Sequence, residues 1–240
     1  MSKPRLAVVA LLLVMIARTA QGSTFQIGSA AALGANDFFD WDQVRAVDGG
    51  GNAIALPSPR AVTSNLGRSA GISDGGSFSG LVEGTDWFGD FASGDRVLYS
   101  GDPNDPAAAA NAFTIAFNTA VRGVGLQITS GAFFDFDASL ELFNGGTSLG
   151  LFTVGGTLLG VEDGSAPFLG ALSDSANITS AVFTLTSNTG AGFGVNRLLT
   201  ADGRDPLPDP GAQVPEPGTL SLLAIGTAGA LARRRSRRLR

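Results

Sequence analysis

Residues 133–154 read FFDFDASLELFNGGTSLGLFTV, and this stretch decides the fold class. Apolar and polar residues alternate through its first half, and successive side chains of a β-strand point to opposite faces of a sheet. The positions expected to face the core are Phe134, Phe136, Ala138, Leu140 and Leu142. The intervening positions form an acidic stripe on the other face. Asn144-Gly145-Gly146 is typical of a hairpin turn, so the stretch predicts two antiparallel strands.

Shorter strand-like segments surround this hairpin at intervals of about 8–12 residues, separated by Gly-rich turns. They are expected at residues 44–47, 61–64, 77–82, 113–117, 124–128, 167–172, 178–186 and 192–199. No long helical period interrupts them. The pattern predicts an all-β fold, an antiparallel β-sandwich, for an ectodomain over residues 23–201.

The N-terminus carries the pattern of a secretion signal. Lys3 and Arg5 precede an apolar run over residues 6–17, and Ala20-Gln21-Gly22 supplies the small residues that a signal peptidase reads. We therefore predict a signal peptide over residues 1–22, with Ser23 as the first residue of the mature chain. An uncleaved N-terminal anchor helix is the alternative.

The C-terminus carries a second signal, in three parts. Residues 202–213 are rich in Pro and Asp and predict an extended tether. Val214-Pro215-Glu216-Pro217 follows, and residues 218–232 are uncharged. A helix of that length spans about 22 Å, which is short for a hydrocarbon core of about 30 Å. Bilayer thinning and snorkelling arginines would close the gap, so we predict a short transmembrane helix.

An arginine cluster follows that helix in the tail, residues 233–240. By the positive-inside rule these side chains act as a cytoplasmic membrane stop and leave the upstream chain outside. They are Arg233, Arg234, Arg235, Arg237 and Arg238, with Arg240 at the end. The alternative is a buried helix of a soluble protein.

The order of Pro215-Glu216-Pro217, apolar run and arginine tail over residues 214–240 closely resembles the PEP-CTERM sorting signal of Gram-negative bacteria. The resemblance implies transient retention in the inner membrane. It also implies an exosortase-type enzyme as a partner, which processes the chain at Val214–Pro217. The product would then reach the cell surface or the extracellular space.

A second resemblance covers residues 90–200. The order of Gly94-Asp95, Phe113-Thr114-Ile115, Gly123-Val124-Gly125 and Phe193-Gly194-Val195-Asn196 is similar to the jelly-roll ectodomains common among PEP-CTERM proteins. It implies a jelly-roll-like sandwich. Many of those domains carry Asp where this chain has Asn196.

Composition narrows the chemistry of the body. Residues 23–215 hold 20 acidic and 7 basic residues, which gives a formal net charge of −13. Such a surface repels nucleic acid, so nucleic-acid binding is excluded. The same residues contain no Cys, His, Lys or Met. This composition excludes a Ser-His-Asp triad, a thiol nucleophile and a zinc site of the usual type. No cofactor is implied, and calcium is the metal to consider because only oxygen ligands remain.

Two clusters are candidate sites. Asp135, Asp137 and Glu141 lie on one face of a predicted strand and could bind calcium; a solvated outer face is the alternative. Trp41 lies among Asp37, Asp40 and Asp42 and could stack on a sugar ring. The alternative for Trp41 is a loop aromatic that closes one end of the sandwich.

We therefore expect an exported, non-enzymatic protein of the cell envelope or extracellular matrix, associated with exopolysaccharide. A calcium-assisted carbohydrate-binding module is the first alternative. A glycoside hydrolase is the second, and it would need two carboxyl groups about 5–9.5 Å apart in a cleft.

Overall fold

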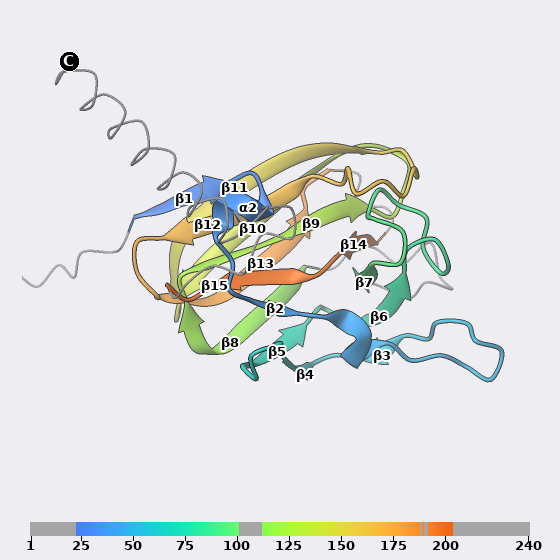
Figure 1. Cartoon of the computed structure of the whole chain (residues 1–240), viewed down its shortest axis with the longest axis horizontal. Helices are drawn as coiled ribbons and strands as arrows, with labels where there is room; N and C mark the ends of the chain where they lie inside the picture. Colours follow the sequence, from blue (N-terminus) through green and yellow to red (C-terminus); the bar gives the residue numbers. More distant parts are fainter. Residues whose placement is uncertain (1–22, 101–111, 188, 190–191, 204–240) are drawn as a thin grey trace, which may run out of the picture. The chain divides into compact units, whose positions relative to one another are not determined.

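The computed structural model describes residues 23–100, 112–187, 189 and 192–203 (Figure 1). Within these residues the chain forms 15 β-strands, one short α-helix and one turn of 3-10 helix. The strands make two antiparallel sheets, of nine and six strands. The predicted all-β fold is therefore confirmed. The predicted signal peptide, the C-terminal helix and almost all of the tether lie outside the described residues.

The nine-stranded sheet is built from both ends of the described chain. Its path is β1 (Thr24–Ile27), β12 (Phe168–Ser173), β9 (Gly123–Ser130), β14 (Phe193–Val195), β7 (Arg96–Ser100), β6 (Ser77–Val82) and β3 (Leu56–Pro57). Beside this path, β15 (Leu198–Ala201) pairs with both β9 and β2 (Asp37–Phe39). The helix α2 (Ala30–Leu33) connects β1 to β2, with Ser29 as its N-cap.

The six-stranded sheet contains the predicted hairpin. Its order is β11 (Thr147–Leu158), β10 (Phe134–Asn144), β13 (Ile178–Leu185), β8 (Phe113–Val121), β5 (Ser69–Ser73) and β4 (Arg60–Thr63). The hairpin closes with Asn144 opposite Thr147, and Gly145 takes the left-handed conformation that the turn needs, at φ 58°. The register shifts once, beside Leu142.

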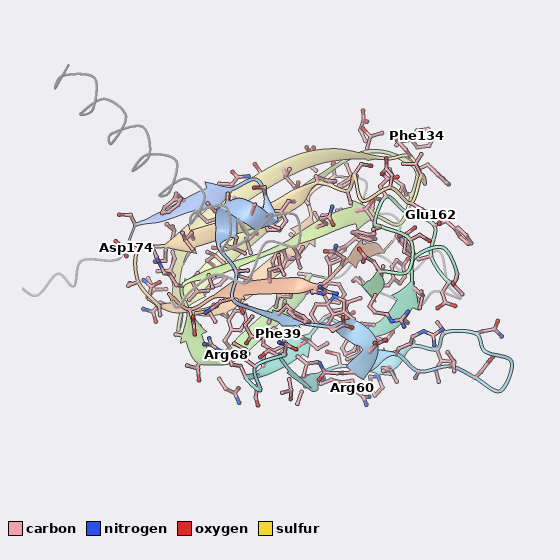
Figure 2. All side chains as sticks on the ribbon, in the orientation of Figure 1. Phe39, Arg60, Arg68, Phe134, Glu162 and Asp174 are labelled. Carbon is pink, nitrogen blue, oxygen red and sulfur yellow. The ribbon has the colours of Figure 1, made fainter. Side chains whose placement is uncertain are left out.

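The core lies between the two sheets. Phe113 of β8 packs edge-on against Phe193 of β14, with ring centroids 5.0 Å apart. Phe39 of β2 contacts Phe117 of β8 with the two rings tilted, at a centroid distance of 6.3 Å. Phe39 lies inside the molecule, whereas Phe134 projects from one end of it (Figure 2). The core therefore joins strands that are far apart in the sequence.

The prediction that Phe134 faces the core is wrong, because this side chain is 80% exposed. It is the first residue of β10, and its φ of 96° turns it away from the alternation that its neighbours follow. Phe136, Ala138, Leu140 and Leu142 are buried as predicted. The alternation fails at its first member because the strand begins beyond the edge of the core.

Two other segments differ from prediction. The expected strand at residues 44–47 is replaced by the 3-10 turn η1 (Trp41–Val44), since the Asp40 carboxylate caps it by accepting the Asp42 N–H at 3.0 Å. The expected single strand at residues 192–199 is two strands. Asn196 and Arg197 interrupt it and lie at the site described below.

The first described residue is tied to the sheet. The Ser23 N–H donates to Asp174 Oδ2 at 3.0 Å, and the Asp174 N–H donates back to the Ser23 carbonyl at 3.1 Å. Thr24 then pairs with Ser173 at the start of β1. The chain is therefore in register from its first described residue.

Candidate functional site

A cleft of about 580 Å³ opens where β9, β15 and the segment before β12 meet. Its walls combine polar side chains with small and apolar ones. They are Gly28, Ser29, Ala30, Asp95, Gln127, Ser165, Ala166, Pro167, Phe168, Asn196, Arg197 and Leu199. These residues come from five separate parts of the sequence.

A chain of amides forms the polar wall of the cleft. The Asn196 Oδ1 accepts the Gln127 N–H at 2.9 Å, and the Asn196 Nδ2 donates to Gln127 Oε1 at 2.7 Å. The same Nδ2 lies 3.3 Å from Asp95 Oδ2. Gln127 Nε2 in turn donates to the carbonyls of Gly164 and Ala166, at 2.7 and 2.8 Å. The wall is pre-organised, because each amide is held by another part of the backbone.

Asn196 can take this position because the last strand pair breaks there. Its N–H donates to the Gln127 carbonyl at 3.2 Å, and its carbonyl accepts the Trp41 Nε1–H at 2.7 Å. The break thus leaves the Asn196 side chain free to turn toward Asp95. An aspartate here would lose the Nδ2 donor that holds Gln127 and would place a second carboxylate beside Asp95.

Phe168 supplies the apolar side of the cleft, and two glycines make room for its ring. A Cβ at Gly125 would lie 2.5 Å from the Phe168 Cζ, and one at Gly170 would lie 2.7 Å from its Cε1. Any larger residue at either position would displace the ring. The glycines of β9 and β12 therefore fix an aromatic side chain at the edge of a polar cleft.

Arg197 supplies the positive charge of the cleft and is half exposed. Its guanidinium lies 4.5 Å above the centre of the Phe38 ring, in a cation–π arrangement. Its Nη2 is 3.8 Å from the Asp40 carboxylate. Both contacts restrain the side chain while its remaining donors stay available.

The cleft has the groups of a binding site for a neutral polar molecule. Its lining includes the Asp95 carboxylate, the Arg197 guanidinium, the Phe168 ring and two amides. The N–H donors of these amides are bonded within the wall, but their oxygens can accept further hydrogen bonds. Asp95 is the only carboxylic acid among its lining residues. The two-acid arrangement of a glycoside hydrolase is therefore not present in this cleft.

The three carboxylates predicted to bind calcium are not gathered into one site. Asp135 accepts from Thr157 Oγ1 at 2.6 Å, Asp137 from Ser187 Oγ at 3.1 Å, and Glu141 from Ser148 Oγ at 2.8 Å. Asp135 and Asp137 line a shallow groove of about 370 Å³ that does not include Glu141. Across the described part of the chain, no three acidic, His or Cys side chains are grouped to hold a metal ion. The geometry fits the solvated outer face.

Trp41 is also placed differently from the stacking prediction. Its exposed fraction is 0%, and it belongs to the core between the sheets. Its indole N–H is used by the Asn196 carbonyl. No face of the ring is left for a sugar, so Trp41 acts on the cleft only by holding the backbone of Asn196.

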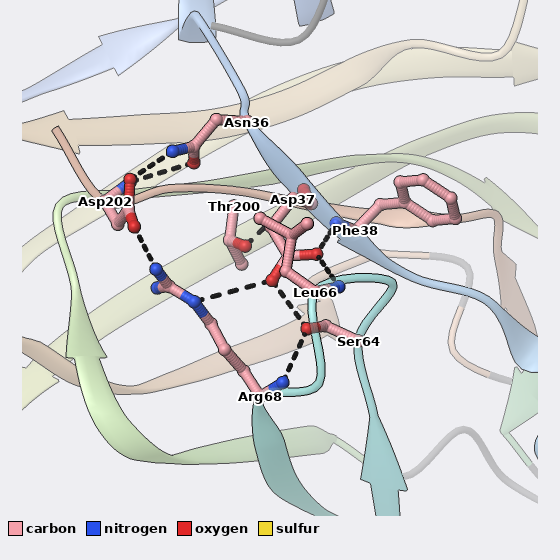
Figure 3. Close-up of polar contacts among 8 residues, drawn as sticks. All are labelled: Asn36, Asp37, Phe38, Ser64, Leu66, Arg68, Thr200 and Asp202. Atoms are coloured by element: carbon pink, nitrogen blue, oxygen red, sulfur yellow. Dashed lines mark hydrogen bonds and ion pairs between the residues drawn. The ribbon is translucent and has the colours of Figure 1, made fainter. Parts of the chain in front are cut away.

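Asp37, beside Trp41 in the sequence, is the centre of a buried polar network (Figure 3). Its carboxylate accepts the N–H groups of Phe38 and Leu66 at 2.8 and 3.0 Å and the Ser64 hydroxyl at 2.5 Å. Arg68 Nε lies 3.5 Å away, and the same guanidinium pairs with Asp202. The network ties β2, the turn between β4 and β5, and the end of β15. The network therefore stabilises the fold.

Two buried acids were missed by the sequence analysis. Asp90 is 2% exposed and accepts the N–H groups of Leu159, Gly160 and Val161 at 2.7 to 3.2 Å. Glu83 is 1% exposed; its Oε1 accepts the Gly89 N–H at 2.6 Å, and its Oε2 has no hydrogen-bond partner among the described residues.

Burial, together with the smaller effects of the nearby charges of Glu162 and Asp90, raises the pKa of Glu83 to about 7 against the lowering effect of the Gly89 N–H. Glu83 does not line the cleft. No local sequence signal marks it, because the loop that buries it is folded by contacts with residues 159–166.

The described residues therefore define an all-β protein of two antiparallel sheets, with a polar cleft where several strands meet. Residues 213–238 match the PEP-CTERM protein-sorting motif. The chain therefore carries a PEP-CTERM signal, which implies export, a membrane-anchored precursor and processing by an exosortase-type enzyme to the cell surface. A search of curated proteins finds no match to this chain.

The match confirms the sorting signal predicted at residues 214–240, although its residues lie outside the described structure. Within the described ranges, no helix is long and apolar enough to cross a membrane. The roles assigned to Val214–Pro217 as processing site and to the arginines as membrane stop stay predictions.

Proposed function

We propose that this protein is a non-enzymatic component of the cell surface or extracellular matrix, and that its cleft binds exopolysaccharide. The observation that carries the proposal is the make-up of the cleft. It combines the oxygen acceptors of two amides and one carboxylate with the Phe168 ring, and its lining includes no second acid. Sugars present hydroxyl groups at their edges and apolar C–H groups on their faces, and the two sides of the cleft match these groups.

The charge of the body supports the choice of ligand. A surface of net charge −13 over residues 23–215 repels anionic polymers. A neutral polysaccharide therefore fits the cleft better than an acidic one. The rim guanidinium of Arg197 and the Asp95 carboxylate then act as hydrogen-bonding groups toward hydroxyls.

Binding of neutral polysaccharides by the full chain tests this proposal. Arg197→Gln and Asp95→Asn should each weaken binding about 10-fold, since each removes a charge-assisted hydrogen bond. Arg60→Gln is the matched control, because Arg60 lies on β4 and does not line the cleft. Equal binding by all three variants would contradict the proposal.

The two alternatives predict different outcomes in the same assay. Calcium-assisted binding would be abolished by EDTA, whereas the cleft described here should bind equally with and without it. A hydrolase would release shorter oligosaccharides over time, and a binding protein releases none.

Processing is tested separately by mass spectrometry of the exported protein. The mature form should lack Arg240 and end near Pro215-Glu216-Pro217. An intact C-terminus in the secreted form would contradict processing, but it would leave the cleft proposal standing.

A further inference from the structure

The strand β11 is a sheet edge that lacks the usual protection. It is the first strand of the six-stranded sheet and pairs only with β10. Residues 142–161, which contain all of β11, include no charged residue and no proline. Natural sheet edges are normally blocked by charges, proline, bulges or a covering segment, because their unpaired backbone groups can accept another strand.

Elsewhere in this sheet, side chains block exposed backbone groups of the edge strands. Gln43 caps the β4 edge: its Nε2 donates to the Thr63 carbonyl at 2.6 Å, and its Oε1 accepts the Thr63 N–H at 2.8 Å. On β11, Thr24 Oγ1 donates to the Leu149 carbonyl at 2.6 Å and Gln26 Nε2 to the Thr153 carbonyl at 2.7 Å. The first half of β11 is thus covered by β1.

The protection ends at Thr153. Backbone groups of alternate residues in a strand point the same way, so those of Gly155 and Thr157 point outward like the Thr153 carbonyl. Within the described residues, no side chain or backbone group bonds to them from that side. The segment 153–158 is therefore an open stretch of edge.

Exposed apolar side chains gather around this open stretch. Phe134, opposite Leu158 in the hairpin, is 80% exposed; Leu151 is 64% and Leu159 62% exposed. Val161 and Phe133 are 50% and 58% exposed. A patch of this kind beside an open edge marks an interaction surface.

The surface is also held rigid. Asp90 fixes residues 159–161 through their three N–H groups. Phe134 keeps a φ of 96°, an uncommon conformation for an aromatic residue, which persists only where the surroundings impose it. The fold thus maintains an apolar edge instead of letting it collapse.

We propose that this edge binds a second copy of the same chain. The β11 strands of two copies would pair antiparallel across residues 153–158, about a two-fold axis, and join the two six-stranded sheets. An isologous pair of this kind needs no partner sequence, because the same neutral segment faces itself. The inference goes beyond the proposed function, since it concerns assembly and does not involve the cleft.

The absence of charge on residues 142–161 favours this surface for self-association. Two bodies of net charge −13 repel each other over most of their surfaces, but residues 142–161 are neutral. Within the six-stranded sheet the nearest acids are Asp135, Asp137 and Glu141 on β10, whereas Asp90, which binds residues 159–161, and Glu162 lie beyond the paired segment 153–158. In the joined sheet, three strand spacings of about 4.8 Å separate β10 from its symmetry mate, or roughly 14 Å. That distance exceeds the Debye length of about 8 Å at physiological salt, so the repulsion is screened.

Sedimentation of the full chain in a non-ionic detergent tests the proposal. The wild type should form dimers, and the dimerisation Kd should fall as NaCl is raised from about 50 to about 300 mM, because repulsion is screened. Gly155→Lys places a charge on the open edge and should raise that Kd at least about 10-fold. A Cβ there meets Asp137 Oδ1 at 3.3 Å, so this exposed side chain must shift slightly, and it meets the Phe136 carbonyl at an ordinary 3.9 Å.

Thr63→Lys is the matched control, on the capped β4 edge of the same sheet. It should dimerise like the wild type. A monomeric wild type, dimers that survive Gly155→Lys, or equal loss in both variants would each overturn the proposal. Circular dichroism of the variants checks the fold. Hydrogen exchange at Gly155 and Thr157 should also slow as wild-type concentration rises, and concentration-independent exchange would contradict β11 as the contact.

Discussion

Glu83 is a buried carboxyl group whose charge opposes folding. Its pKa is raised from 4.5 to about 7 by burial, with Glu162 and Asp90 adding to the effect. A carboxyl group with a raised pKa binds more protons in the folded state than in the unfolded state. Its favourable contribution is therefore complete below about pH 4.5, is lost as the pH rises to about 7, and stays lost above that value.

We predict that Glu83→Gln removes this loss. The amide resembles the protonated acid and can still accept the Gly89 N–H. The variant should gain about 1–2 kcal/mol in unfolding free energy relative to wild type on going from pH 5 to pH 8. Urea denaturation at both pH values measures this. Glu141→Gln on the outer face is the control, and a Glu83→Gln profile parallel to wild type would contradict the prediction.

Gly80 of β6 lets the backbone of Val44 and Arg45 pack closely against the strand. A Cβ at this position would lie 2.7 Å from the Arg45 Cα and 2.9 Å from the Val44 carbonyl oxygen. Both are backbone atoms that no side-chain rotation can move. Gly71 of β5 has nothing within 4 Å of the same position.

This contrast predicts unequal effects of one substitution. Gly80→Ala should destabilise the protein by about 1–3 kcal/mol, because η1 and the segment after it must shift. Gly71→Ala should be neutral or slightly stabilising, since it only restricts the unfolded chain. Thermal unfolding of the two variants compares them, and equal losses would show that the clash at Gly80 is relieved.

The elements were predicted best where the sequence alternates. The β10–β11 hairpin follows from the period-two pattern and the Asn-Gly-Gly turn, both of which are local. The prediction that Phe134 faces the core was wrong because its φ depends on where the core ends, and no local sequence pattern records that position. The strand predicted at residues 44–47 was wrong because the Asp40 cap stabilises a 3-10 turn at residues 41–44 and outweighs the strand preference of Val44.

The whole molecule determines the cleft, and this explains why the sequence did not predict it. Asp95, Gln127 and Asn196 meet through three strands or strand ends separated by up to 101 positions. Asn196 and Asp95 were noticed only through a family resemblance, and Gln127 only interrupts an apolar strand. The predicted sites used acids close together in the sequence, which the sheet then separated or buried.

The net charge of the body affects the stability of the whole molecule. A body of −13 repels itself, and salt screens that repulsion. We predict that the Tm rises by a few degrees between about 10 and about 150 mM NaCl, as the Debye length falls from about 30 to about 8 Å. Differential scanning calorimetry measures this. CaCl2 at matched ionic strength should give the same Tm; a clearly higher value would indicate a specific calcium site and a falling Tm in NaCl would contradict the argument.

The contact between Ser23 and Asp174 would connect folding with the predicted cleavage of a signal peptide after Gly22. In the precursor, Ser23 contributes a peptide N–H to the Asp174 carboxylate. Removal of the leader after Gly22 would convert that N–H into a free ammonium group, already placed 3.0 Å from its counter-ion. The cut would thus replace a neutral donor with an ion pair and add a positive charge at an acidic surface. Cleavage at the predicted position would then leave the β1 strand more firmly anchored than it is in the uncleaved chain.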